Sequence, residues 1–243
     1  MESGVHRLFV PPEQIAELVR LDPAQSRHLE LVLRLKPGAE LEVFDGGGAR
    51  WPARLESPGV LRLGARKEPE RGPADVWLAQ ALAKGEKLDL VVQKATELGA
   101  RRILPLAAER SVVRLDDERA ERRTGRLRRI AQEAARQCGR NHVPAVDVPC
   151  TLADLAGLLR AEPERRGLLL DPEERAVRLS QAARGASRIL LAIGPEGGFT
   201  PAERARAAAA GFASVALGRL VLRTETAGLA ALAIVQHLAG DLG

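Results

Sequence analysis

The stretch RILLAIGPEGGFTPAERARAAAAGFASVALGRLVLRTETA, residues 188–227, decides the fold class. Its first six residues, one arginine followed by five apolar residues, predict a buried strand, and a glycine loop follows them directly. A helix is expected over 201–210, a strand over 213–217, and a last helix from about 226 to 238. Strands that alternate with helices in this way are typical of an α/β fold with a parallel sheet.

The start of the helix at 201 is marked by three local signals. Thr200 can cap the helix, Pro201 suits its first position, and Glu203 completes a capping box. Such a cap is worth on the order of 1 kcal/mol. The helix therefore begins directly after the glycine loop, and the loop lies between a strand end and a helix N-terminus.

The glycine loop is Gly194-Pro195-Glu196-Gly197-Gly198. In an open α/β sheet, a loop between a strand end and a helix is a natural ligand site, and glycines let the backbone approach the ligand closely. The Gly-Lys-Ser/Thr of a phosphate loop is absent, and the spacing does not match GxGxxG, so nucleotide phosphates are disfavoured. On spacing alone, a ligand loop and a merely tight connection are equally open.

A second unusual loop follows the strand at 213–217. It reads Leu217-Gly218-Arg219-Leu220-Val221-Leu222 and leads into Arg223-Thr224-Glu225-Thr226 at the next helix start. Thr224 and Glu225 can satisfy free backbone N–H groups of that helix, which is a purely structural role. The same segment also places a cation, two hydroxyls and a carboxylate beside the glycine loop, which favours a ligand site.

Further strands and helices alternate upstream. The apolar patterns predict strands at 76–82, 102–106, 143–148 and 167–170, and helices at 88–98, 118–138 and 152–161. Together with the C-terminal elements, they indicate a parallel sheet with helices on both faces.

The N-terminal third has a different pattern. Short strands are expected at 7–10, 40–45, 49–56 and 60–66, and a helix at 22–34 that Asp22 can cap. Short strands separated by Gly and Pro turns indicate a small β-barrel. Residues 67–75 are charged and poor in apolar side chains, as in a linker. We therefore expect two domains, residues 1–70 and 75–243.

Composition narrows the class of protein. The net charge is +5 and the pI about 9.8, a basic balance that favours nucleic-acid partners, although 32 acidic residues are interspersed. The two cysteines, Cys138 and Cys150, and the four histidines show no metal-ligand spacing, so no metal is expected. No secretion signal or membrane-spanning run is recognised, and a cytoplasmic protein is expected.

These motifs resemble a known family. GPEGGFTPAE followed by Gly211-Phe212 and LGRLVLRTETA closely resembles the RsmE family, 16S ribosomal RNA uracil-N3 methyltransferases of the SPOUT class. The segments 85–100, 109–115 and 133–144 resemble the family too, and HRLFVPP and LRLKPGAELEVFDG resemble its PUA-like barrel. The resemblance covers nearly the whole chain. It implies a C-terminal trefoil knot, a homodimer, and 16S rRNA of the small ribosomal subunit as partner.

The resemblance also implies S-adenosylmethionine as cofactor, held by the strand end at Leu170 and by two loops. The residues it assigns to cofactor binding are Leu170, Ile193, Gly194, Glu196, Gly197, Gly198, Leu217, Gly218, Leu222 and Thr224. Backbone groups and apolar side chains are expected to bind the adenine.

Uracil N3 is a poor nucleophile while it carries its proton. Glu225 is the candidate base that accepts the proton, and Arg223, always charged, is the candidate that stabilises the uracil anion. An equally open alternative is an Arg223–Glu225 ion pair that only rigidifies the knot.

Four arginines in family-like segments are candidate RNA-binding residues: Arg7, Arg110, Arg136 and Arg140. The arginines of the 118–138 helix are interpreted as a solvated face that as a group adds phosphate affinity.

Two rival functions remain. One is methylation by a SPOUT enzyme at another RNA position, for instance on the ribose 2′ oxygen. The other is a non-catalytic RNA-binding factor of ribosome assembly that keeps a cofactor pocket.

Overall fold

The structure is a computed structural model that describes residues 5–69, 74–83, 86–111 and 117–242. The chain divides into two compact units. The first contains residues 1–72 and 135–143, and the second contains residues 73–134 and 144–243. The sequence predicted two domains that are each continuous along the chain. The structure differs from this prediction, because residues 135–143 belong to the first unit. Residues 70–73, at the expected boundary, lie outside the described residues.

The first unit is built on a five-stranded sheet in the order β1-β3-β4-β5-β2. Its strands are β1 (His6–Phe9), β2 (Leu18–Arg20), β3 (Glu40–Phe44), β4 (Arg50–Ser57) and β5 (Val60–Leu63). β1 runs parallel to β3, and the other pairs are antiparallel. Alternate apolar residues such as Leu41, Val43, Leu55 and Leu61 are buried in one core. The four expected strands are present, and β2 is an addition.

The helix expected over 22–34 is divided in two. Asp22 caps α1 (Pro23–Arg27), because its Oδ1 accepts from the N–H groups of Ala24 and Gln25 at 2.8 and 2.9 Å. A π-helical turn, His28–Val32, continues it. A 3₁₀ turn, Pro12–Gln14, was not expected.

Arg7 and backbone hydrogen bonds to the 46–48 turn join residues 135–143 to the first unit. Its Nε donates to Glu42 at 3.0 Å, and its Nη1 donates to the carbonyls of Ala135 and Arg140 at 3.3 and 3.2 Å. Its Nη2 donates to Asn141, and the guanidinium lies 4.6 Å above the Phe44 ring centre. One half-buried cation thus ties strand β1 to the end of the long helix.

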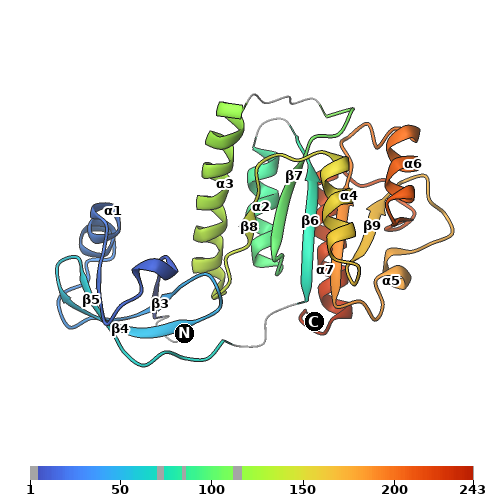
Figure 1. The fold of residues 1–243 in the computed structure, drawn as a ribbon. Coiled ribbons are helices and arrows are strands. Elements are labelled where there is room, and N and C mark those ends of the chain that lie inside the picture. Colours follow the sequence, from blue (N-terminus) through green and yellow to red (C-terminus); the bar gives the residue numbers. More distant parts are fainter. Residues whose placement is uncertain (1–4, 70–73, 84–85, 112–116, 243) are drawn as a thin grey trace. The chain divides into compact units, whose positions relative to one another are not determined.

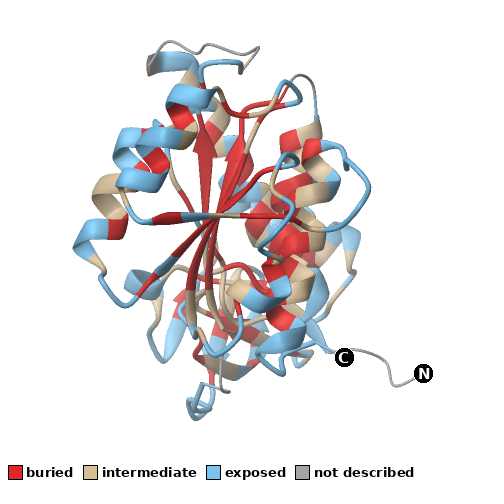
Figure 2. Cartoon of the chain, turned by 90° about the vertical axis from the view of Figure 1, so that its right-hand side faces the viewer, coloured by how far each residue is buried: buried red, intermediate tan, exposed pale blue. Residues whose placement is uncertain are grey.

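The second unit contains a six-stranded, fully parallel sheet in the order β11-β9-β10-β6-β7-β8. Figure 1 labels β6, β7, β8 and β9 among its strands. Its strands are β6 (Asp75–Ala81), β7 (Arg102–Leu106), β8 (Ala145–Val146), β9 (Arg166–Leu170), β10 (Arg188–Ile193) and β11 (Phe212–Val215). Almost every residue of β6, β7, β9 and β10 is buried, and Figure 2 shows these strands in red. Continuous burial is expected where helices cover both faces of a parallel sheet.

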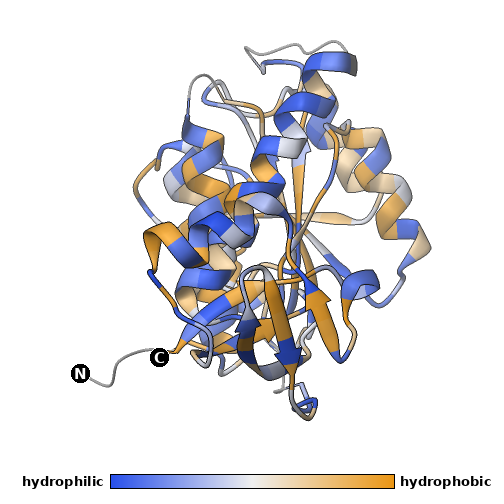
Figure 3. Cartoon of the chain, turned by 90° about the vertical axis from the view of Figure 1, so that its left-hand side faces the viewer, coloured by the Kyte–Doolittle hydropathy of each residue, from blue (hydrophilic) through white to orange (hydrophobic). Residues whose placement is uncertain are grey.

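Helices cover both faces of this sheet. On one face, α4 (Leu152–Ala161) and α6 (Pro201–Ala209) pack on Trp77, Leu104 and Leu190. On the other face, α7 (Thr224–Leu238) packs on β6, β10 and α2 (Lys87–Glu97). α3 (Asp117–Cys138) and the short α5 (Leu179–Ala182) complete the unit. Figure 3 shows apolar and polar stretches alternating along the helices, as amphipathic packing requires.

The predicted α/β class with a preceding barrel is thus confirmed, and the trefoil knot stays a prediction. Within the described residues, no helix is long and apolar enough to cross a membrane.

The contact between α7 and β6 depends on a glycine. A Cβ at Gly228 would lie 2.3 Å from Oε1 of Gln80, a side chain that is only 1% exposed. We expect Gly228→Ala to lower the free energy of unfolding by about 1–3 kcal/mol, because a packed core resists added volume. Urea unfolding followed by circular dichroism measures it.

Gly125→Ala is the matched control, because Gly125 is also helical and a Cβ there meets nothing within 4 Å. It should stabilise the protein by up to about 1 kcal/mol through helix propensity. Equal changes in the free energy of unfolding in the two variants would contradict the packing role of Gly228.

Candidate active site

A cavity of about 310 Å³ lies at the carboxyl ends of β9, β10 and β11. We call it the strand-end cavity. Most of its lining residues come from three segments: 170–172 after β9, 193–198 after β10, and 215–224 after β11. The register of the sheet places Leu170 beside both Ile193 and Val215, so the three strands end at one level. Ligands bind at such carboxyl edges in open α/β sheets.

The cavity brings together nearly all the residues that the sequence assigned to a cofactor. Leu170, Ile193, Gly194, Glu196, Gly198, Leu217, Gly218, Leu222 and Thr224 line it. Gly197 does not line it, and its carbonyl instead accepts a hydrogen bond from Arg110 Nη1 at 2.6 Å. Asp171 also lines the cavity and was missed, because a single acidic residue after a strand gives no distinctive signal.

The segment 217–222 keeps its backbone polar groups available. None of its N–H or C=O groups hydrogen-bonds to another residue in the part of the chain that the structure describes. Its side chains are mostly exposed, with Leu220 at 80% and Val221 at 78%. Backbone groups without protein partners beside an apolar cavity can bind the polar edge of a ligand.

Thr224 ties this segment to the glycine loop. Its hydroxyl donates to the carbonyl of Gly194 at 2.6 Å and accepts from Gln80 Nε2 at 2.8 Å. Thr224 is 5% exposed and Gln80 is 1% exposed. The interpretation of Thr224 as a helix cap is therefore wrong, because its hydroxyl joins two segments of the cavity and α7 has no side-chain cap.

Glu203 holds the glycine loop from the other side. The capping box forms as expected: the Glu203 carboxylate accepts from the N–H of Thr200 at 2.8 Å. The same carboxylate accepts from the N–H of Glu109 at 2.9 Å and is 2% exposed. Glu109 in turn accepts from the Thr200 hydroxyl at 3.0 Å and pairs with Arg206. The hydrogen bonds from Arg206 and, to a smaller extent, from Thr200 lower the pKa of Glu109.

Arg223 and Glu225, the two candidate catalytic residues, point to different partners. Glu225 lies 3.5 Å from the Lys87 ammonium, and Lys87 also pairs with Glu196 at 3.0 Å. Hydrogen bonding to Glu196 and the nearby Glu225 charge raise the pKa of Lys87. Arg223 lines the cavity, is exposed, and has no side-chain partner among the described residues. The Arg223–Glu225 ion pair of the structural alternative is therefore absent.

The four candidate RNA-binding arginines are not equivalent. The hydrogen bonds of Arg7 are made within the first unit, which gives it a structural role there. Arg136 lies 3.4 Å from the His28 ring, and Arg140 is half-buried. Arg110 is exposed beside the glycine loop. Contacts of these residues with RNA stay a prediction.

Lys87 and Gln80 were missed at the sequence level. Gln80 lies in an apolar strand and Lys87 at a helix start, and both reach partners more than 100 positions away. A glutamine within an otherwise apolar strand is the one sequence signal that could have identified Gln80. No local pattern singled out Lys87.

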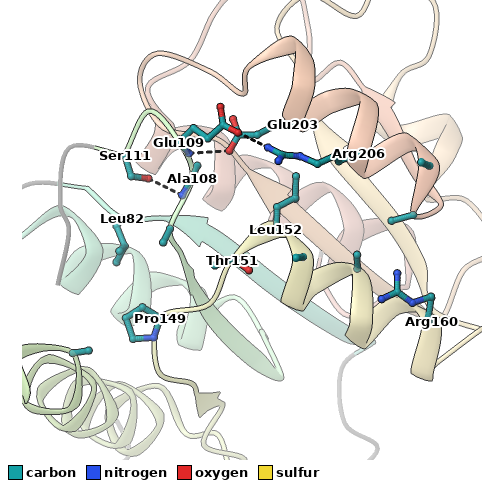
Figure 4. Close-up of a pocket in the computed structure, with 16 residues that line it drawn as sticks. Leu82, Ala108, Glu109, Ser111, Pro149, Thr151, Leu152, Arg160, Glu203 and Arg206 are labelled. Carbon is teal, nitrogen blue, oxygen red and sulfur yellow. Dashed lines mark hydrogen bonds and ion pairs between the residues drawn. The ribbon is translucent and has the colours of Figure 1, made fainter. Parts of the chain in front are cut away.

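A second cavity, of about 860 Å³, lies between α4, α6 and the segment 107–111 (Figure 4). Small and apolar residues line much of it, and the Glu109–Arg206 pair lies at one end. It shares no lining residue with the strand-end cavity. No group of three or more candidate metal ligands occurs among the described residues.

Comparison with protein families defines the class of this fold and cavity. Residues 70–236 match the family described as an RNA methyltransferase domain, and residues 21–59 match an RNA methyltransferase PUA domain. The chain is therefore an RNA methyltransferase with an N-terminal PUA domain, as the resemblance of its motifs predicted.

Comparison with individual relatives identifies a more specific family. The ribosomal RNA small subunit methyltransferase E of Synechocystis is 38% identical over 96% of this chain and 78% of its own length. The Bacillus subtilis enzyme of the same name is 33% identical over 86% of each chain. The structure of the Neisseria gonorrhoeae enzyme, bound to S-adenosyl methionine, superposes with a TM-score of 0.86 at 32% identity, covering 97% of this chain and 98% of that one. The chain belongs to the ribosomal RNA small subunit methyltransferase E family.

The Thr224 hydroxyl gives a direct test of how the cavity is held together. Thr224→Val keeps the shape but removes the donor to the Gly194 carbonyl and the closer of the two acceptors of Gln80 Nε2, which also donates to the Thr224 carbonyl at 3.4 Å. We expect a loss of about 1–3 kcal/mol in the free energy of unfolding, the cost of unsatisfied buried polar groups. Denaturant titration measures it, and Thr224→Ser should stay near the parent protein.

Thr226→Val, two residues further along the same helix and exposed, is the control. It should change stability by less than about 0.5 kcal/mol. If Thr224→Val stays within that range, the hydroxyl does not hold the two segments together.

Proposed function

We propose that this protein transfers a methyl group from S-adenosylmethionine to N3 of a uridine in 16S ribosomal RNA of the small subunit. The observation that carries the proposal is the strand-end cavity, where available backbone groups lie next to Arg223 and Glu225. Membership of the methyltransferase E family supports the same reaction and substrate.

The residues of the strand-end cavity fit the cofactor. Leu170, Ile193 and Leu217 offer apolar surface for an adenine ring, and the backbone of 217–222 offers donors and acceptors for its polar edge. The volume, about 310 Å³, lies within the range of small-molecule sites. When bound, the cofactor supplies an electrophilic methyl carbon on a sulfonium sulfur.

The protein must prepare the uracil for an in-line displacement. Glu225 accepts the proton of uracil N3, which leaves a lone pair and a negative charge that spreads onto the ring carbonyl oxygens. As the bond from N3 to the methyl carbon forms, the bond from that carbon to sulfur breaks. The products are N3-methyluridine and a neutral thioether, and the proton remains on Glu225.

Arg223 is placed to stabilise the uracil anion. It lines the cavity, and within the described residues its guanidinium has no partner that would neutralise it. A fixed cation aimed at developing negative charge lowers the barrier, because it needs no reorganisation during the reaction.

The proposal also covers contacts with RNA, a homodimer and the place of the reaction in the cell. Arg110, Arg136 and Arg140 contact phosphates, and their contribution falls as salt rises. A homodimer buries Leu220 and Val221, which are largely exposed in the single chain. The reaction takes place in the cytoplasm, where small subunits are assembled.

The reaction can be tested with labelled cofactor and unmodified small ribosomal subunits. We expect a single N3-methyluridine in the small-subunit RNA, located by nuclease mapping and mass spectrometry. Methylation elsewhere would contradict the uracil-N3 assignment but keep the enzyme class. Cofactor binding without transfer to subunits, free rRNA or tRNA would favour the non-catalytic assembly factor.

Arg223→Ala separates catalysis from binding. We expect kcat to fall by about 100-fold, the loss typical of removing one group that stabilises a developing anion. The Kd for S-adenosylmethionine, measured by calorimetry, should change much less. Arg223→Lys should recover part of the rate because it keeps the charge. Equal losses in kcat and in cofactor affinity would contradict the catalytic role of Arg223.

A further inference from the structure

A lysine that the proposed mechanism does not use lies beside the proposed base. Lys87 is the first residue of α2, and its ammonium lies 3.0 Å from Glu196 Oε1 and 3.5 Å from Glu225 Oε2. Glu196 belongs to the glycine loop and Glu225 to the start of α7. We propose that Lys87 is a positioning residue for methyl transfer, holding the Glu225 carboxylate in place relative to the glycine loop. The inference rests on the proposed function.

Glu225 depends on Lys87 for its electrostatic environment. Its side chain is 15% exposed, and the Oε2 atom is buried without a hydrogen bond. In the described part of the chain, Lys87 is the one cation within ion-pair distance of it. A buried carboxylate oxygen that accepts no hydrogen bond is stabilised and oriented by the cation beside it.

Lys87 also ties Glu225 to the cavity itself. Glu196 lines the strand-end cavity and Glu225 does not, so the ammonium is the link between the base and the cofactor loop. The Thr224–Gly194 hydrogen bond joins the same two segments one residue away on α7. Two adjacent residues of α7 are thereby attached to the glycine loop, one through a buried hydroxyl and one through Lys87.

Helix stability does not explain why a lysine is placed here. The N-terminus of a helix carries partial positive charge, and a cation at the first residue is unfavourable there. Lys87 lies at that unfavourable end of α2, whereas Lys94 lies in the last turn, where cations are favoured. A residue that costs the helix stability, yet contacts two carboxylates of the site, is explained by the site.

The test is a comparison of Lys87→Ala, Lys87→Arg and Lys94→Ala in the full-length protein. In Lys87→Ala we expect kcat on small subunits to fall about 100-fold, the effect of a misplaced catalytic group. The Kd for S-adenosylmethionine should change less than threefold, and the unfolding midpoint should not fall. Lys87→Arg should restore at least a tenth of the parent kcat, because it keeps the charge.

Lys94→Ala is the matched control. Lys94 pairs with Glu97 on the same helix at 2.9 Å and is similarly exposed, 42% against 36% for Lys87. It should keep the parent kcat. The double variant Lys87→Ala with Glu225→Gln should lose little more than Glu225→Gln alone, because both act through one carboxylate.

The outcomes separate the inference from the proposed function. An inactive parent protein that binds the cofactor overturns the proposed function. An active parent protein with an unchanged Lys87→Ala variant overturns only the role of Lys87. A Lys87→Ala variant that loses cofactor affinity in proportion to kcat also overturns it, since the lysine would then hold the cofactor loop alone.

Discussion

The register of three parallel strands is the constraint on which the site depends. β9 pairs with both β10 and β11, and Leu170 faces Ile193 on one side and Val215 on the other. A slip of one residue would turn every side chain of a strand to the opposite face, where it would not fit the helices packed there. The strands therefore end together, and three loops distant in sequence surround one cavity.

Buried polar groups then fix the loops to one another. Thr224 joins the start of α7 to the glycine loop and to β6, and Glu203 joins α6 to the segment after β7. Each replaces solvent hydrogen bonds with protein ones at nearly full burial, which orients both partners. The segment 217–222 keeps its backbone groups available among the described residues, and it lines the cavity.

Local patterns predicted most elements, because each carries its own signal. Apolar runs, the Asp22 cap and the Thr200–Glu203 capping box mark strands and helix starts within a few residues. Elements of three or four residues, such as β2 and α5, are too short to show a period. The membership of 135–143 in the first unit was also not predictable, because it depends in part on Arg7, some 130 positions away.

The sequence by itself determined the α/β class, the barrel before it, and most of the residues around the strand-end cavity. It could do so because the strand, turn and helix signals are local features, and because the motifs of the two loops resemble a known family that binds its cofactor there. Only the tertiary structure decided the partners of the reactive side chains. Glu225 pairs with Lys87 rather than Arg223, and Thr224 bonds Gly194 rather than capping its helix. These partners depend on which helix start lies beside which loop. The packing of the whole sheet determines that arrangement.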